Sequence, residues 1–223
     1  MEHVRGWRPA GVGFVLAFVA SLVASGVLAR TSLYLPDASA AELREYYTGS
    51  VAAVVAASTL QAVAALGLAW FSAGLARTLD PAAGPIAGRV RWAGGVSAAA
   101  FAASVVLSLL LVLIADDAGD GTLTILGRST LACGGALHLT GMGVLVWLVS
   151  RNGLATGFRP RWALRFGLVL APLLAVSMVS IVATPVTRLE PLWRLLSAVW
   201  LIAVCAAGRR RVATTAPSSG TPV

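Results

Sequence analysis

Lysine is absent from the 223 residues of this chain, and charged residues of either sign are scarce. They make up 12% of the sequence, whereas a soluble domain carries roughly 25%. The two cysteines, Cys133 and Cys205, both lie inside apolar segments, which excludes the disulfide framework of a small secreted protein. The shortage of charge leaves little room for a soluble fold.

Sequence signatures of enzymes are also missing. The chain has no H-E-x-x-H zinc motif, no phosphate-binding loop and no G-x-S-x-G nucleophile motif. No aspartate or glutamate lies inside an apolar segment, which excludes an intramembrane aspartyl dyad. The last two apolar segments hold no histidine that could serve a serine–histidine pair. These absences favour a protein that is not an enzyme.

Ligands for metals and cofactors are equally few. His138 is the only histidine in an apolar segment, so a haem held by two histidines within the spans is excluded. A soft-metal site would have to combine His138 with Met142 and Met178, and this is the weaker interpretation of those residues. We therefore expect no metal and no cofactor.

Long apolar runs are what the sequence has in abundance, and hydrophobic residues make up 58% of it. About 20 apolar residues suffice for a helix to cross a bilayer. Six runs have roughly this length: Gly11–Ala29, Val51–Leu75, Ala93–Ala115, Ile125–Val149, Ala163–Thr184 and Leu192–Ala207. The expected fold class is all-α, a polytopic membrane protein with six transmembrane helices and the lipid bilayer as its main partner.

The apolar runs divide the chain into three parts. Residues 1–10 are expected to form a cytoplasmic lead, residues 11–207 a six-helix membrane domain, and residues 208–223 a basic cytoplasmic tail. After its arginines the tail is mostly threonine, proline, serine and glycine, a composition that predicts disorder.

The arginines predict the orientation in the membrane. With a cytoplasmic N-terminus, twelve of the 17 face the cytoplasm: Arg5, Arg8, Arg77, Arg89, Arg91, Arg151, Arg159, Arg161, Arg165, Arg209, Arg210 and Arg211. The other five, Arg30, Arg44, Arg128, Arg188 and Arg194, face outward. The positive-inside rule then places both termini in the cytoplasm of a plasma-membrane protein. Because the arginines form no continuous patch, the net charge of +8 does not indicate nucleic-acid binding.

The first outer loop has a helix signal of its own. Ser39 and Glu42 have the spacing of a capping box, which predicts a short helix from Ala40 to about Tyr47. Tyr46 and Tyr47 indicate that this helix lies at the membrane surface. It could be a lid or a partner contact, but an interfacial connector is the interpretation we favour.

The fourth run, extending from Thr124 to Ser150, carries a predicted packing face. At about 100° per residue, Gly127, Gly134, His138 and Gly141 fall on one narrow side of the helix. Small residues let another helix come close, and we expect that helix to be the second or the fifth.

A candidate polar site surrounds His138. Counted from the centres of their runs at ~1.5 Å per residue, Gln61, His138 and Ser177 lie within about 10 Å of one depth. They could bind a proton or a polar ligand, or His138 could only hydrogen-bond Gln61, Ser177 or a carbonyl freed near Pro172. The second interpretation is favoured because no carboxylate is expected inside the membrane.

The end of the last outer loop holds one more pair of charges. Glu190 and Arg194 are four residues apart, so they are expected to pair at the outer interface, where a long arginine side chain can reach water.

Several short motifs resemble those of a family of six-span bacterial membrane proteins whose function is unknown. They are Pro36-Asp37-Ala-Ser39-Ala-Ala-Glu42, His138, and the stretch from Arg151-Asn-Gly153 to Pro160-Arg161-Trp162. The resemblance covers about residues 11–207 and implies an integral membrane location, with no catalytic residues.

Two functions remain open at this point. One is a non-enzymatic membrane protein that acts through helix packing or partners, including a second copy of itself. The other is a small carrier or channel with its polar site near His138. The first is favoured, because the polar residues cluster at one depth and do not continue as a path.

Overall fold

A computed structural model describes residues 6–31, 36–79, 85–158, 160–181 and 189–207. The tail expected at residues 208–223 and the first half of the lead lie outside the described residues. Every regular element in the described ranges is a helix, as the all-α class requires. They are α1 (Trp7–Leu28), α2 (Ala40–Gly49), α3 (Val51–Ala76), α4 (Ile86–Ile114), α5 (Asp120–Leu131), a π-helical segment η3 (Ala132–Leu137), α6 (His138–Ala155), α7 (Arg161–Val176), a 3-10 segment η4 (Ser177–Ile181) and α9 (Glu190–Ala207).

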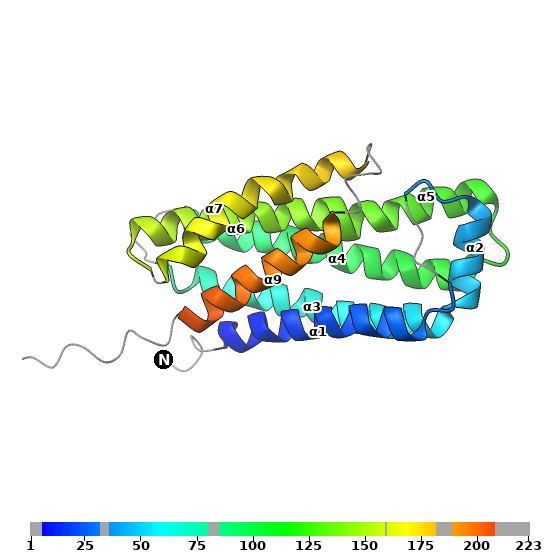
Figure 1. Cartoon of the computed structure of the whole chain (residues 1–223), viewed down its shortest axis with the longest axis horizontal. Helices are drawn as coiled ribbons and strands as arrows, with labels where there is room; N and C mark the ends of the chain where they lie inside the picture. The colour runs from blue at the N-terminus through cyan, green and yellow to red at the C-terminus, as the bar shows by residue number, and fades with distance from the viewer. Residues whose placement is uncertain (1–5, 32–35, 80–84, 159, 182–188, 208–223) are drawn as a thin grey trace, which may run out of the picture.

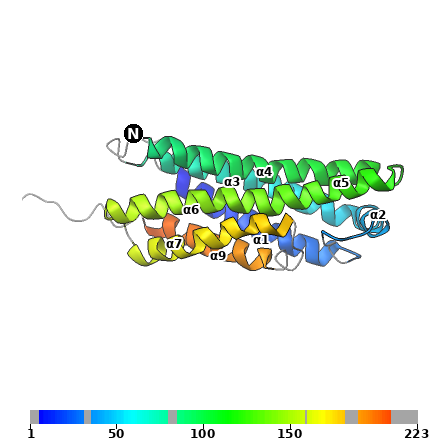
Figure 2. The same cartoon turned by 90° about the horizontal axis from the view of Figure 1, so that it is seen from above.

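The long helices pack side by side as an elongated bundle (Figures 1 and 2). Each contacts the next in the order α1, α3, α4, α6, α7 and α9, and α9 returns to α1, which closes a ring. Aromatic and aliphatic side chains, among them Phe14, Phe18, Phe101 and Trp200, fill the ring as one core. The ring encloses packed side chains, so the polar groups described below are held by solid protein on most sides.

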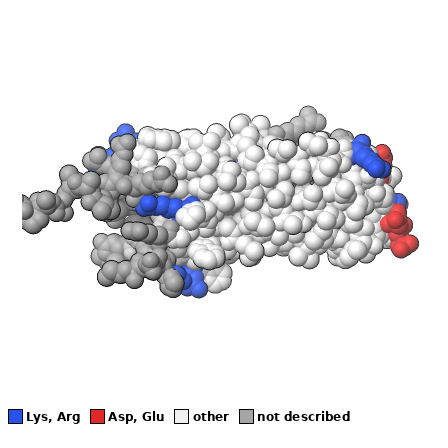
Figure 3. Space-filling model, turned by 90° about the horizontal axis from the view of Figure 1, so that it is seen from below, with Lys and Arg blue, Asp and Glu red and all other residues white. Residues whose placement is uncertain are grey.

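Five helical stretches in the described part of the chain are long and apolar enough to cross a membrane: Trp7–Leu28, Val51–Ala76, Ile86–Ile114, Asp120–Ala155 and Arg161–Ser180. Their outer faces carry large apolar side chains such as Leu16, Leu66 and Leu113, which are 66%, 72% and 80% exposed. Figure 3 shows the charged side chains gathered at the two ends of the molecule, with an uncharged flank between them. By composition, therefore, the chain is a multi-pass membrane protein.

Helix α9 does not extend along the whole bundle. It begins beside the middle of the bundle and ends at the same end of the molecule at which α1 begins (Figures 1 and 2). The start of α1 and the end of α9 therefore lie at the same end of the bundle. The 3-10 turn that follows α7 also stops short of the opposite end, where α2 and α5 lie.

Helix α2 lies across that opposite end and begins as the sequence predicts. The Ser39 hydroxyl accepts the Glu42 amide at 3.3 Å and the Glu42 carboxylate accepts the Ser39 amide at 2.7 Å, so the capping box is confirmed. Tyr46 and Tyr47 are buried against the ends of α4 and α5, and burial raises the pKa of Tyr46 to about 12. Both tyrosines thus pack against protein, and whether this helix is a connector, a lid or a partner contact stays a prediction.

We expect the Ser39→Ala variant to lose about 1 kcal/mol of local stability in α2, because the Glu42 amide in the first turn loses its side-chain acceptor. Amide hydrogen exchange of residues 40–49 measures the loss directly. Thr48→Ala, which changes a hydroxyl near the other end of α2, is the control and should leave the first-turn amides as protected as before. Unchanged exchange in Ser39→Ala would contradict the capping argument.

The same capping box predicts a pH dependence of α2. Hydrogen bonds from the backbone and hydroxyl of Ser39 lower the pKa of Glu42 below its ordinary value of 4.5. A lowered folded-state pKa means that the added stability is complete above 4.5 and is lost as the pH falls through the folded pKa. Exchange of the α2 amides, corrected for intrinsic rates, should therefore speed up below pH 4.5. The Glu42→Gln variant should show no such step.

Candidate functional site

His138 is the first residue of α6 and lies in the middle of the core, only 3% exposed. Its Nδ1 is 2.9 Å from the Ser97 hydroxyl oxygen and 3.1 Å from the Ser97 carbonyl oxygen, while that hydroxyl donates to the His138 carbonyl at 2.8 Å. All three contacts are satisfied when Nδ1 carries the proton and donates to Ser97. The ring stacks on Phe101 with centroids 4.6 Å apart and lies 6.4 Å from the ring of Phe14.

The hydrogen-bond partner of His138 differs from our expectation. The partner is Ser97 of α4, the third span, and none of the described hydrogen bonds joins His138 to Gln61, to Ser177 or to a carbonyl near Pro172. The cause lies one turn further along α6, at Gly141. A methyl group on Gly141 would be 3.0 Å from both Cα and N of Ser97, so only glycine lets the α4 backbone approach this closely.

The remaining predicted site residues are spread over several contacts. Gly127 faces Leu43 of the short helix α2, and Gly134 faces Ser104 of α4. The glycine face therefore packs against α2 and the third span, and the expectation of the second or fifth span was wrong. Gln61 is half-buried on α3, and its side chain has no hydrogen-bond partner among the described residues. Ser177 donates to the carbonyls of Leu174 at 2.6 Å and Ala136 at 3.2 Å, in a network separate from that of His138. Whether His138, Gln61 and Ser177 serve one site stays a prediction.

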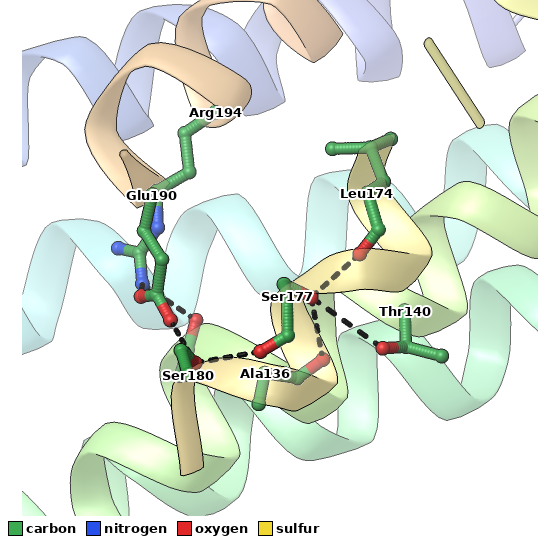
Figure 4. Close-up of polar contacts among 8 residues, drawn as sticks. Ala136, Thr140, Leu174, Ser177, Ser180, Glu190 and Arg194 are labelled. Atoms are coloured by element: carbon green, nitrogen blue, oxygen red, sulfur yellow. Dashed lines mark hydrogen bonds and ion pairs between the residues drawn. The ribbon is translucent and has the colours of Figure 1, made fainter. Parts of the chain in front are cut away.

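A second buried polar network lies where α9 begins (Figure 4). Glu190 and Arg194 form the expected pair four residues apart, with Nη2 3.5 Å from Oε2. The Ser180 hydroxyl is 2.7 Å from Glu190 Oε1, and Arg194 Nη2 donates to the Gly134 carbonyl at 2.8 Å. The side chains of Glu190 and Arg194 are only 9% and 20% exposed. Together these residues link α9, η4 and the π-helical segment.

The two segments that contact the Glu190–Arg194 pair, η3 and η4, are not α-helical. The π-helical segment Ala132–Leu137 supplies the carbonyls of Gly134 and Ala136, and η4 supplies Ser177 and Ser180. The two segments contact one another. Gly135 has no side chain, and a methyl group there would collide with the Glu190 carboxylate. Single π turns inside α-helices occur often at functional sites, because they redirect carbonyls that an α-helix would hide.

The depth of this pair corrects our expectation of an interfacial position. The Arg194 guanidinium lies over the Phe18 ring, 6.0 Å from its centroid, and Phe18 lies 6.1 Å from Phe101. These two phenylalanines are near the middle of α1 and α4, and Phe101 is the ring on which His138 stacks. Glu190 and Arg194 are therefore buried at mid-bundle, and a carboxylate does lie among the helices.

Sequence reasoning missed this site because it counted Glu190 and Arg194 as the end of an apolar run. Two signals nearby could have indicated it. Gly134 and Gly135 are adjacent, which leaves bare backbone on two sides of one turn, and Ser177 and Ser180 recur at the spacing of a 3-10 helix. Neither signal indicates which helix packs against these residues.

Among the described residues, no group of three histidine, cysteine or acidic side chains is placed to hold a metal ion. Comparison of the chain with protein-family models, curated proteins and solved structures finds no match. The resemblance to six-span bacterial proteins therefore stays a prediction, and the function must be argued from the site itself.

We expect the hydrogen bond between Ser97 and His138 to contribute only modestly to stability. Single variants Ser97→Ala and His138→Leu and the double variant form a cycle whose coupling energy should be about 0.6 kcal/mol, the average measured between membrane helices. Reversible unfolding in mixed micelles measures how much unfolding free energy each of the three variants loses relative to the unaltered protein. A coupling well above 2 kcal/mol would contradict the view that this contact mainly aligns α4 and α6.

Proposed function

We propose that this protein is a small membrane carrier whose working site is the Glu190–Arg194 pair. The observation that supports the proposal is a buried ion pair held between a π-helical and a 3-10 segment. Ionisable residues among membrane helices are costly, and they commonly mark the path of an ion or substrate. A pair with no task could be replaced by apolar residues at little cost or at a gain.

The position of α9 adds support. In many carriers the binding site lies at mid-membrane, where discontinuous helices end and leave backbone groups available to a ligand. Here α9 begins at mid-bundle with Glu190, and α7 ends there in the turn that carries Ser177 and Ser180. The end of α7 and the start of α9 can therefore move relative to the continuous helices α1, α3 and α4 without breaking a helix.

The topology belongs to the same proposal. We propose that α9 is the sixth membrane helix, which returns the chain from mid-bundle to the side where α1 begins, and that both termini are cytoplasmic at the plasma membrane, with twelve of the 17 arginines on that side. A reporter that works only outside the cytoplasm, fused after Arg211, should be inactive. Activity at that point would overturn the topology.

The second candidate is a non-enzymatic protein that acts through helix packing or a membrane partner, including a second copy. The environment of His138 favours this candidate, because Nδ1 is hydrogen-bonded to Ser97 and the ring packs against Phe101 and Phe14. In this alternative the Glu190–Arg194 pair would only fix the packing of α9.

Access to the site from both sides of the membrane distinguishes the two candidates. In a variant with Cys133→Ala and Cys205→Ala, a single Ser180→Cys substitution places a thiol beside Glu190. A charged, membrane-impermeant methanethiosulfonate is then applied to right-side-out and to inside-out vesicles. A carrier exposes the thiol to each face in turn, so we expect modification in both preparations.

The control is Ser21→Cys in the same background, because Ser21 is fully buried on α1 and outside the network. It should stay unmodified in both preparations, which shows that the reagent does not enter through unfolding. Modification of Ser180→Cys from one face only would overturn the carrier. No modification from either face would overturn it too, and would favour the packing protein.

A further inference from the structure

We propose that the Glu190–Arg194 pair binds a zwitterionic group, with the ligand's ammonium at Glu190 and its acidic group at Arg194. This inference rests on the proposed function only in treating the pair as a ligand site. It adds the chemical class of the ligand.

The first step is that the pair is incompletely bonded. A charge-assisted hydrogen bond between nitrogen and oxygen is usually 2.7–2.9 Å long, whereas Arg194 Nη2 is 3.5 Å from Glu190 Oε2. The same nitrogen donates at 2.8 Å to the Gly134 carbonyl. The two charges are thus adjacent but do not satisfy each other.

The second step is that each member of the pair also has a hydrogen-bonding atom that lacks a good partner. Arg194 Nε is shielded from solvent and has no hydrogen-bond partner among the described residues. On the acidic side, Oε1 of Glu190 accepts from Ser180 at 2.7 Å, while Oε2 has only the long contact to Arg194 among the described residues. A buried guanidinium donor without an acceptor is costly. One spare donor and one spare acceptor of opposite charge therefore lie side by side.

The third step is charge balance. A simple anion beside Arg194 would also face the Glu190 carboxylate, and a simple cation beside Glu190 would face Arg194. At mid-bundle, where charges are poorly screened, either arrangement leaves a net charge that must be paid for in desolvation. A zwitterion keeps the site neutral and gives each protein charge a full partner.

Two sources could supply this chemistry, a free amino acid-like solute or the head of a zwitterionic lipid such as phosphatidylethanolamine. The test uses the full-length protein and thermal unfolding. Alanine and glycerophosphoethanolamine are the free probes, added to protein in nanodiscs of phosphatidylglycerol alone, a lipid that has no zwitterionic head. Replacing half of the phosphatidylglycerol by phosphatidylethanolamine tests the lipid source. Choline chloride and inorganic phosphate test the separate charges.

A zwitterion present at about 100 times its Kd should raise Tm by about 5–10 °C. We expect this rise with the free probes or with the phosphatidylethanolamine discs, and the arm that responds identifies the source. Choline and phosphate should have no effect. Glu190→Gln and Arg194→Gln should each weaken binding at least tenfold, whereas Asp120→Asn, which removes a charge from an exposed pair elsewhere, should bind like the unaltered protein.

Three results would overturn the inference. One is no response to either zwitterion source, and another is an equal response to choline or phosphate. The third is loss of binding in only one of the two glutamine variants, since this would indicate a simple ion. The carrier proposal is tested separately by Ser180→Cys. Two-sided access without zwitterion binding defeats only this inference, and zwitterion binding with one-sided access defeats only the carrier.

Discussion

The Arg194→Met variant is expected to lose about 3–5 kcal/mol of unfolding free energy, the usual cost of leaving one member of a buried ion pair without its partner. Methionine keeps an unbranched stem of similar shape up to about the position of Nε, but it removes every donor, the charge and the cation–π contact with Phe18. Glu190 then remains 9% exposed with only Ser180 as a partner, and the Gly134 carbonyl loses its donor as well. Reversible unfolding in mixed micelles measures the loss.

A double variant separates the charge from the packing. In Glu190→Gln with Arg194→Met, no charge is left, and the glutamine can still accept the Ser180 hydroxyl. Most of the lost stability should therefore return, which makes the two substitutions strongly non-additive. Asp120→Asn removes the exposed pair with Arg44, where Asp120 is 76% exposed, and should cost less than about 1 kcal/mol. If Arg194→Met costs no more than Asp120→Asn, the pair is not buried as described.

The parts of the fold that sequence reasoning could predict are those decided by neighbours in the chain. The capping box joins Ser39 and Glu42, whose side chains and amides meet whenever the helix starts there. The apolar runs behave similarly, because a helix in lipid must satisfy its own backbone whatever lies beside it. Of the six expected spans, five are found among the described helices.

The choice of partner helices could not be predicted in the same way. Gly134 and Gly141 mark where α6 and the π-helical segment allow a close approach, but any helix of suitable shape could use the space. The ring order brings α4 to this face, so Ser97 reaches His138 and Gln61 does not. That order depends on contacts over the whole bundle, which no single segment encodes.

The depth of Arg194 illustrates a second limit. Hydropathy measures how apolar a segment is, and it places Glu190 and Arg194 at the start of the last apolar run. It does not record where α7 changes to a 3-10 turn, nor that α9 begins beside the middle of the bundle (Figure 1). A residue at the end of a run can therefore lie at the centre of the molecule, and the candidate site was missed for this reason.

The second large loss of stability is expected at the close contact between α4 and α6. The Gly141→Ala variant is expected to lose about 1–3 kcal/mol, the usual range for overpacking a well-packed core. The added methyl group would lie 2.9 Å from Ser97 Cβ and 3.0 Å from Ser97 Cα and N. Two of these are backbone atoms, so relief requires the two helices to move apart and cannot come from a side-chain rotation.

The matched control is Gly95→Ala on α4, where nothing lies within 4 Å of an added methyl group. Alanine has a higher helix propensity than glycine by up to about 1 kcal/mol, so this variant should be as stable as the parent or slightly more stable. Because separation of the helices also breaks the Ser97 contact of His138, Gly141→Ala and Ser97→Ala together should cost less than the sum of the two. Equal stability of Gly141→Ala and Gly95→Ala in reversible unfolding would show that α4 does not approach α6 at Gly141.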